Sequence, residues 1–291
     1  MTLKTKELYA DISLFLVAVF WGVTFLPMAK ALHTNGVFTI LFWRFLIAFL
    51  LMLIISFKFI KKADKNSIKH GAILGLFLFM GFAVQTFALK YIPSSTVAFI
   101  TGLNVVFVPF VVFVFFAKKI AIYSYIGALL SAFGLYFLSN TELGFTKGEL
   151  LSVICALAYT LQIVLTSEFV KKSETMVLVS VQFLVVAILS LFCAVVFESS
   201  AIPVVNFDFI TAVLVTSIFA TVIAFYVQTK AQEFTSPIKT SLIFTFEPVT
   251  AGIVGYFIGK ENISQTQIMG AFAILFGIII SEIGSYKKHS H

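Results

Sequence analysis

Glu247 is the first candidate for chemistry, because it lies inside a long apolar stretch and is followed directly by a proline. It falls about ten residues into the run 237–258, which at about 1.5 Å per residue places it near the middle of a bilayer. Ionisable groups at that depth are costly and usually functional. Pro248 has no N–H, so it should leave the carbonyl of Phe244 without its helical partner and kink the helix. We predict that Glu247 binds a cationic substrate or accepts a proton; a structural, hydrogen-bonded carboxylate is the alternative.

Arg44 is the second candidate. It falls about eight residues into the apolar run 37–59, well below the surface at which that run begins. A guanidinium at this depth can bind a substrate carboxylate through two parallel hydrogen bonds. It can equally organise a structural hydrogen-bond network or extend outward to water, and the sequence leaves these roles open.

Two aromatic residues and four amides complete the candidate site. Trp21 and Tyr159 fall near mid-depth, away from the interfaces where aromatic residues gather, so they can form walls or gates of a pocket. Ordinary packing is the alternative for both. The amides inside apolar runs are Asn104, Gln85, Gln162 and Gln228. Each can donate and accept hydrogen bonds, which suits a zwitterionic ligand, and each can instead bridge two helices.

The framework that positions these residues is strongly apolar. Of the 291 residues, 60% are hydrophobic and 11% are charged, whereas about a quarter of a soluble domain is charged. A transmembrane helix takes about 20 mainly apolar residues. Such runs lie near 9–31, 37–59, 70–90, 94–117, 120–139, 148–169, 176–197, 208–230, 237–258 and 265–285. The predicted fold class is therefore an all-α integral membrane protein with about ten transmembrane helices; a transmembrane β-barrel would show shorter, alternating segments.

Lysine placement indicates the orientation. Lysine-rich segments, such as the one containing Lys118 and Lys119, alternate with lysine-poor ones, and the richer set includes both chain ends. Because positive residues favour the cytoplasmic side, we expect both termini in the cytoplasm and the protein in the plasma membrane. The net charge of +7 comes from these loops and does not indicate a nucleic-acid partner. The first apolar run exceeds the core of a cleaved signal peptide, about 7–15 residues, so we expect it to be retained.

The chain also repeats itself. Two stretches share one spacing of glycine and aromatic residues: Gly127-Ala128 with Phe133-Gly134, and Gly270-Ala271 with Phe276-Gly277. Further corresponding pairs are Trp21 with Tyr159 and Asn104 with Glu247. We predict two related halves, 9–139 and 148–285, with shared hydrophobicity alone as the alternative explanation.

Each half contains an odd number of predicted helices, so the second half should enter the membrane inverted relative to the first. The loop charges agree, because the stretch 58–69 is rich in lysine, whereas its counterpart 198–208 has none and carries Glu198 and Asp208. Inverted five-helix repeats around a central cavity are typical of secondary transporters, which bind substrate near the midplane.

At this point the sequence resembles the EamA-type members of the drug/metabolite transporter superfamily, over about 9–285. The resemblance is carried by Trp21-Gly22, Ala88-Leu89-Lys90-Tyr91, Pro93-Ser94, Phe234-Thr235-Ser236-Pro237, Glu247-Pro248 and the pair Gly270 and Gly277 after Glu261. It implies ten helices in two repeats, with a cavity lined mainly by the first, third, fourth, sixth, eighth and ninth helices. It also implies export or exchange of amino acids, amines, drugs or related metabolites. Asn104-Val105 stands where the second half has Glu247-Pro248, so the pair has a single carboxylate.

We therefore expect a secondary or facilitative transporter that exports small metabolites by alternating access, with protons as the coupling ion if Glu247 titrates. The expected partners are the substrate and the lipid bilayer. No metalloprotease, P-loop or dinucleotide-binding motif occurs, so we predict neither an enzyme nor a cofactor or metal site. A lipid or lipid-linked-sugar translocase of the same architecture is the main alternative. The sequence indicates neither the substrate nor the oligomeric state.

Overall fold

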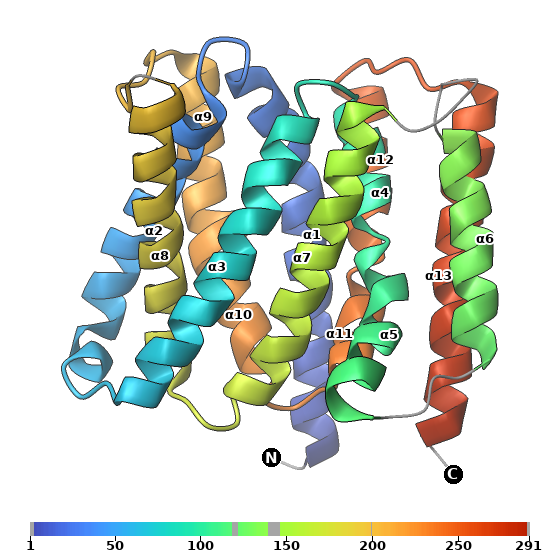
Figure 1. The fold of residues 1–291 in the computed structure, drawn as a ribbon, viewed down its shortest axis with the longest axis horizontal. Helices are drawn as coiled ribbons and strands as arrows, with labels where there is room; N and C mark the ends of the chain where they lie inside the picture. Colours follow the sequence, from blue (N-terminus) through green and yellow to red (C-terminus); the bar gives the residue numbers. More distant parts are fainter. Residues whose placement is uncertain (1–2, 118–121, 139–145, 199, 290–291) are drawn as a thin grey trace.

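The computed structural model describes residues 3–117, 122–138, 146–198 and 200–289, and every regular element in these ranges is a helix (Figure 1). Lys118 and Lys119, which contributed to the predicted orientation, lie outside the described residues. Both chain ends lie at the same end of the bundle, which we call the terminal end; the other is the distal end (Figure 1).

The first half consists of long helices joined by short turns. Its elements are α1 (Leu3–Ala31), α2 (Val37–Ile60), α3 (Lys65–Ala88), α4 (Ser94–Thr101), α5 (Asn104–Phe116) and α6 (Ile122–Leu138). Asp64 caps α3, because its side chain accepts hydrogen bonds from the hydroxyl and the backbone N–H of Ser67 and from the N–H of Asn66. These bonds favour the carboxylate and lower the pKa of Asp64.

The second half follows the same plan. Its elements are α7 (Lys147–Phe169), α8 (Thr175–Phe197), α9 (Phe207–Ser217), the π-helical segment η1 (Ile218–Ile223), α10 (Ala224–Ala231), α11 (Pro237–Ile243), α12 (Phe246–Phe257) and α13 (Gln265–His289). A capping box starts α7: the backbone N–H of Glu149 donates to the Thr146 hydroxyl, and the Glu149 carboxylate accepts from the N–H of Thr146.

The predicted apolar runs agree with helices, with one systematic difference. The runs 94–117 and 237–258 were each predicted as one helix, but each is interrupted, at residues 102–103 and 244–245. Within the described residues, seven spans are long and apolar enough to cross a membrane: Thr5–Ala31, Val37–Ile60, Lys65–Ala88, Ser94–Phe116, Lys147–Phe169, Thr175–Phe197 and Phe207–Ala231.

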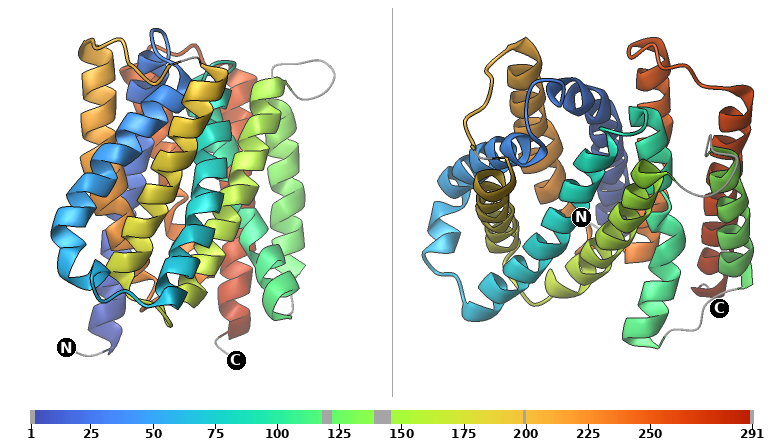
Figure 2. Two further views of the ribbon diagram at one scale, coloured as in Figure 1. Left: turned by 60° about the vertical axis from the view of Figure 1, so that its left-hand side comes forward. Right: turned by 45° about the horizontal axis from the view of Figure 1, so that its top comes forward.

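The main helix contacts recur when the two halves are exchanged, which supports the predicted two-repeat architecture. Helix α2 packs against its counterpart α8, and α6 packs against α13 at one side of the bundle (Figure 2). Helix α3 contacts α7, and its counterpart α10 contacts α1. Helix α1 contacts α12, and its counterpart α7 contacts α5 and also α4. The counterparts α1 and α7 run in opposite directions along the bundle (Figure 1).

The repeated glycines explain how α6 and α13 approach each other. A Cβ on Gly134 would lie 2.6 Å from the backbone N of Ile274, and one on Gly277 would lie 2.6 Å from the carbonyl oxygen of Gly127. These positions exclude a side chain because they meet backbone atoms of the partner helix. Gly71 of α3 similarly allows a close helix contact, because a Cβ there would lie 2.8 Å from the Val181 Cβ of α8.

Gly134→Val should therefore weaken the α6–α13 pair. The added methyl groups meet backbone that cannot rotate away, and overpacking of this kind costs about 1–3 kcal/mol. Thermal unfolding of the purified protein in detergent measures the effect. The matched control is Ala132→Val on an exposed position of the same helix. Equal melting temperatures for the two variants would show that this contact does not hold the helices together.

Candidate functional site

The two interrupted helices place equivalent residues at their breaks. Helix α4 ends at Thr101 and α5 begins at Asn104, while α11 ends at Ile243 and Glu247 lies in the first turn of α12. Discontinuous helices at corresponding positions of two repeats are where transporters commonly form their binding sites.

Backbone hydrogen bonds at the breaks correct one expectation. The carbonyl of Phe244 is not left free by Pro248, because the N–H of Glu247 donates to it over 3.0 Å. In the first half the N–H of Val105 donates to the carbonyl of Gly102 over 3.2 Å, without any proline. Both breaks are thus tighter, i to i+3 turns, and a proline is not required to form one.

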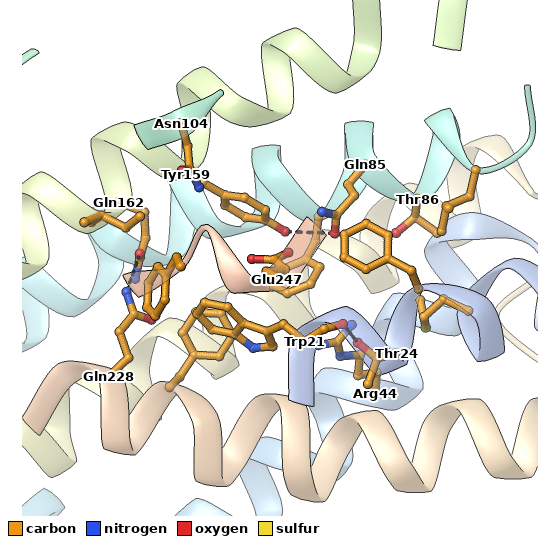
Figure 3. A pocket seen from close by; sticks show the side chains of 17 residues that line it. Trp21, Thr24, Arg44, Gln85, Thr86, Asn104, Tyr159, Gln162, Gln228 and Glu247 are labelled. Carbon is orange, nitrogen blue, oxygen red and sulfur yellow. Dashed lines mark hydrogen bonds between the residues drawn. The ribbon is translucent and has the colours of Figure 1, made fainter. Parts of the chain in front are cut away.

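All eight predicted site residues line one cavity in the bundle, next to these breaks (Figure 3). The empty space among the lining side chains is about 600 Å³, including the part open to solvent. The predicted residues are Trp21, Arg44, Gln85, Asn104, Tyr159, Gln162, Gln228 and Glu247. The lining residues that were not predicted are Thr24, Phe25, Met28, Phe82, Thr86, Leu89, Ile163, Phe225 and Phe244.

Glu247 lies centrally in this cavity, between the side chains of Tyr159 and Trp21 (Figure 3). Only 8% of the residue is exposed, and its carboxylate has no hydrogen bond or ion pair with any residue that the structure describes. Helix α1 comes very close to it, since a Cβ on Gly22 would lie 2.6 Å from the Glu247 carbonyl oxygen. A buried carboxylate without a protein partner is available to a ligand cation or a proton.

Arg44 is buried, with 2% of the residue exposed, so it does not extend outward to water. Its Nε donates to the Thr221 hydroxyl over 2.8 Å and its Nη2 to the Ala220 carbonyl over 3.4 Å. Trp21 donates to the same carbonyl through Nε1 over 2.9 Å. The π-helical segment η1 therefore positions both residues, although the resemblance did not place the second helix among the main cavity walls.

Tyr159 and Asn104 lie on the wall formed by α7 and α5. The Tyr159 hydroxyl donates to Gln85 Oε1 over 3.2 Å, so the aromatic ring and the amide are held together (Figure 3). The Asn104 backbone carbonyl accepts from the Thr160 hydroxyl over 3.1 Å. The side-chain Oδ1 of Asn104 is buried without a hydrogen-bond partner among the described residues.

Gln162 and Gln228 belong to a chain of glutamines that joins helices on the terminal side of the cavity. Gln228 Nε2 donates to Gln162 Oε1, and Gln162 Nε2 donates to Gln182 Oε1, each over 3.2 Å. Gln228 also donates to Gln232, which bonds to Ser167. Bridging of helices, left open by the sequence, is thus present for both predicted amides. Gln182 and Gln232 were not predicted as site residues.

The terminal end below the cavity is packed. Trp21 contacts Phe225 and Phe244, with ring centroids 5.2 and 4.9 Å apart. Farther out, Lys239 of α11 bonds to Glu7 and Asp11 of α1, at 2.7 and 2.8 Å. Lys239 therefore joins two helices through its ion pairs. Among the described residues no group of three or more His, Cys, Asp or Glu could hold a metal.

Comparison with known proteins gives consistent matches. The EamA-like transporter family matches this chain twice, over residues 8–140 and 146–282. An uncharacterized transporter of Archaeoglobus fulgidus is 33% identical over 94% of this chain and 86% of its own length. The uncharacterized transporter YyaM of Bacillus subtilis is 27% identical over 94% of this chain and 93% of its own length. A solved crystal structure, 19% identical, superposes with a TM-score of 0.70 over 96% of this chain and 98% of that chain, which shows a shared fold.

Proposed function

The chain belongs to the EamA-like transporter family, and from this premise we propose that it moves small metabolites such as amino acids, amines or drugs outward across the plasma membrane by alternating access. The observation that carries the proposal is the unpaired Glu247 carboxylate in a buried cavity beside two corresponding helix breaks. The chain is a transporter by family and a multi-pass membrane protein by its apolar helices; the substrate class, the direction and the mechanism are our proposals.

We propose ten membrane crossings, in inverted halves of 9–139 and 148–285, with both termini in the cytoplasm. The interrupted pairs α4–α5 and α11–α12 would each act as one crossing, as would α9 with η1 and α10. Support comes from the opposite directions of α1 and α7 and from the position of both termini at one end (Figure 1).

Side-specific labelling should place the two corresponding loops on opposite sides. In a background without Cys155 and Cys193, an impermeant maleimide should label Val204→Cys on intact cells. It should label Lys62→Cys only after permeabilisation, because the first loop is lysine-rich and the second is not. Labelling of both cysteines from the same side would contradict the inverted arrangement.

In the proposed cycle the two halves rock about the cavity, which opens to one side at a time. The described state supports closure at the terminal end, where Trp21 packs against Phe244 and, farther out, Lys239 pairs with Asp11. The cavity lining extends the other way, toward Met28 and Leu89 near the distal ends of α1 and α3. Exchange of a proton for a cationic substrate on Glu247 would couple transport to protons; if Glu247 never titrates, the protein would be a facilitator.

The direct test begins with a thermal-shift screen of amino acids, amines and drugs against the purified protein. Each hit is then tested for flux into proteoliposomes, with empty liposomes as the control. We expect at least one hit to be transported, and the flux of its labelled form to fall when the unlabelled compound is added. Binding without flux for every hit would contradict a transport function.

A lipid or lipid-linked-sugar translocase is the second candidate, because an apolar groove lies between α12, α4 and α13. It is lined by residues such as Phe99, Gly252, Tyr256 and Phe272, and shares no lining residue with the cavity that contains Glu247. This separation favours the small-metabolite proposal. Headgroup scrambling by proteoliposomes, with no flux of any small hit, would favour the translocase.

A further inference from the structure

The π-helical segment η1 has a specific relation to the cavity. It widens one turn between α9 and α10, and widened turns of this kind are frequent at functional sites. Its Ala220 carbonyl and Thr221 hydroxyl accept the hydrogen bonds of Arg44, and the Ser217 hydroxyl donates to the Arg44 carbonyl over 2.9 Å. The segment thus fixes the Arg44 guanidinium, and Ser217 at the end of α9 fixes the Arg44 backbone carbonyl.

These bonds leave much of the guanidinium unused. An arginine carries five N–H donors, and the bonds to Thr221 and Ala220 occupy two of them. The guanidinium also lies over the Phe82 ring, 4.4 Å from its centroid. No carboxylate pairs with it among the residues that the structure describes, although a buried positive charge is costly without an anionic partner.

The cavity therefore holds one unpaired charge of each sign, on different helices. Glu247 comes from α12 and Arg44 from α2 (Figure 3). Aromatic side chains, including Trp21 and Phe82, lie among the other lining residues. A ligand that satisfies both charges carries a cationic group, an anionic group and an apolar body.

We propose that Arg44 is a specificity-determining residue that binds the carboxylate of a zwitterionic substrate while Glu247 faces its ammonium group. The transported class is then amino acids or similar zwitterions rather than simple amines. Guanidinium and carboxylate match in geometry and form strong, charge-assisted hydrogen bonds. This inference rests on the proposed transport function and narrows its substrate class.

A structural role for Arg44, clamping α2 to η1, would affect all ligands alike, so the test compares two ligands that differ only in the carboxylate. Leucine is paired with 3-methylbutylamine, and phenylalanine with 2-phenylethylamine; binding is measured by titration of the purified protein. The wild type should bind each amino acid at least about tenfold more tightly than its amine, since a polar site left unpaired discriminates strongly.

Arg44→Gln should abolish this preference, because it should weaken the binding of the amino acid and change the binding of the amine little. Thr221→Val keeps the guanidinium but removes its Nε acceptor, so it should lower the preference partly. It also provides a second readout if Arg44→Gln does not fold. The control is Ser13→Ala, whose hydroxyl bonds only locally to the Tyr9 carbonyl on an outer face of α1.

Three results would overturn the inference: equal wild-type affinities for acid and amine, an unchanged preference in both variants, or equal losses for both ligands. A failure of the proposed function looks different, because then no compound crosses the liposome membrane, whether or not Arg44 discriminates between acid and amine in binding.

Discussion

Glu247→Gln should remove the pH dependence of transport and reduce the flux of a substrate that carries an ammonium group by about tenfold or more. The amide has nearly the same shape as the carboxylate but can neither titrate nor carry charge. Hydrogen bonds to charged groups contribute about 1.5–3 kcal/mol, which corresponds to roughly one to two orders of magnitude in affinity. Flux into proteoliposomes, measured across neutral and mildly acidic pH, tests both parts.

Glu168→Gln is the matched control for this experiment. Glu168 is partly exposed and pairs with Lys171 on the same short stretch of chain, outside the cavity. Its substitution should leave flux and pH dependence unchanged. A Glu247→Gln protein that behaves like wild type would remove Glu247 from the mechanism. Lower flux with an intact pH profile would assign Glu247 to substrate binding and place proton coupling elsewhere.

Lys239→Met should shift the protein toward the state that is open at the terminal end. Lys239 joins α11 to α1 through Glu7 and Asp11, whereas its counterpart in the first half is the neutral Thr96. Because 23% of the Lys239 side chain is exposed, each ion pair is worth up to about 1 kcal/mol, so the loss of both shifts the populations by up to about thirtyfold.

Maleimide labelling of Ser241→Cys measures this shift, because Ser241 is fully buried on α11 in the closed state. Lys239→Met should increase the labelling rate in the background without native cysteines. Lys171→Met is the control, since the ion pair of Lys171 with Glu168 does not join two helices. An unchanged rate for Lys239→Met would show that the ion pair does not hold the terminal end closed.

Helix positions could be predicted from the sequence because the length of an apolar run is a local property matched to the bilayer. The family could also be predicted, because the residues that carry the resemblance follow the order of the family's motifs in both halves of the chain. The same reasoning identified polar residues such as Arg44 and Glu247 by their unusual depth. Nothing local predicted the break at Gly102, where α4 and α5 on its two sides both contact α7.

The rest of the cavity could not be predicted because a single sequence does not reveal the rotation of a helix in a bundle. Thr24, Phe25 and Met28 line the cavity at helical spacing from Trp21. This spacing identifies them only when it is already known that the Trp21 face of α1 points into the cavity. The π-helical segment had no sequence signal that we could identify. Its role in holding Arg44 depends on contacts between α2 and η1, far apart in the chain.

The central claim is that the cavity is exposed to one side of the membrane at a time. Two single cysteines test it most directly: Leu89→Cys, at a partly exposed position of the cavity lining at the distal end of α3, and Ser241→Cys on α11. Each is labelled from its own side with an impermeant maleimide, with and without Lys239→Met. We predict reciprocal changes, with faster labelling at Ser241→Cys and slower labelling at Leu89→Cys. An increase at both positions would indicate a continuous pore and would contradict alternating access.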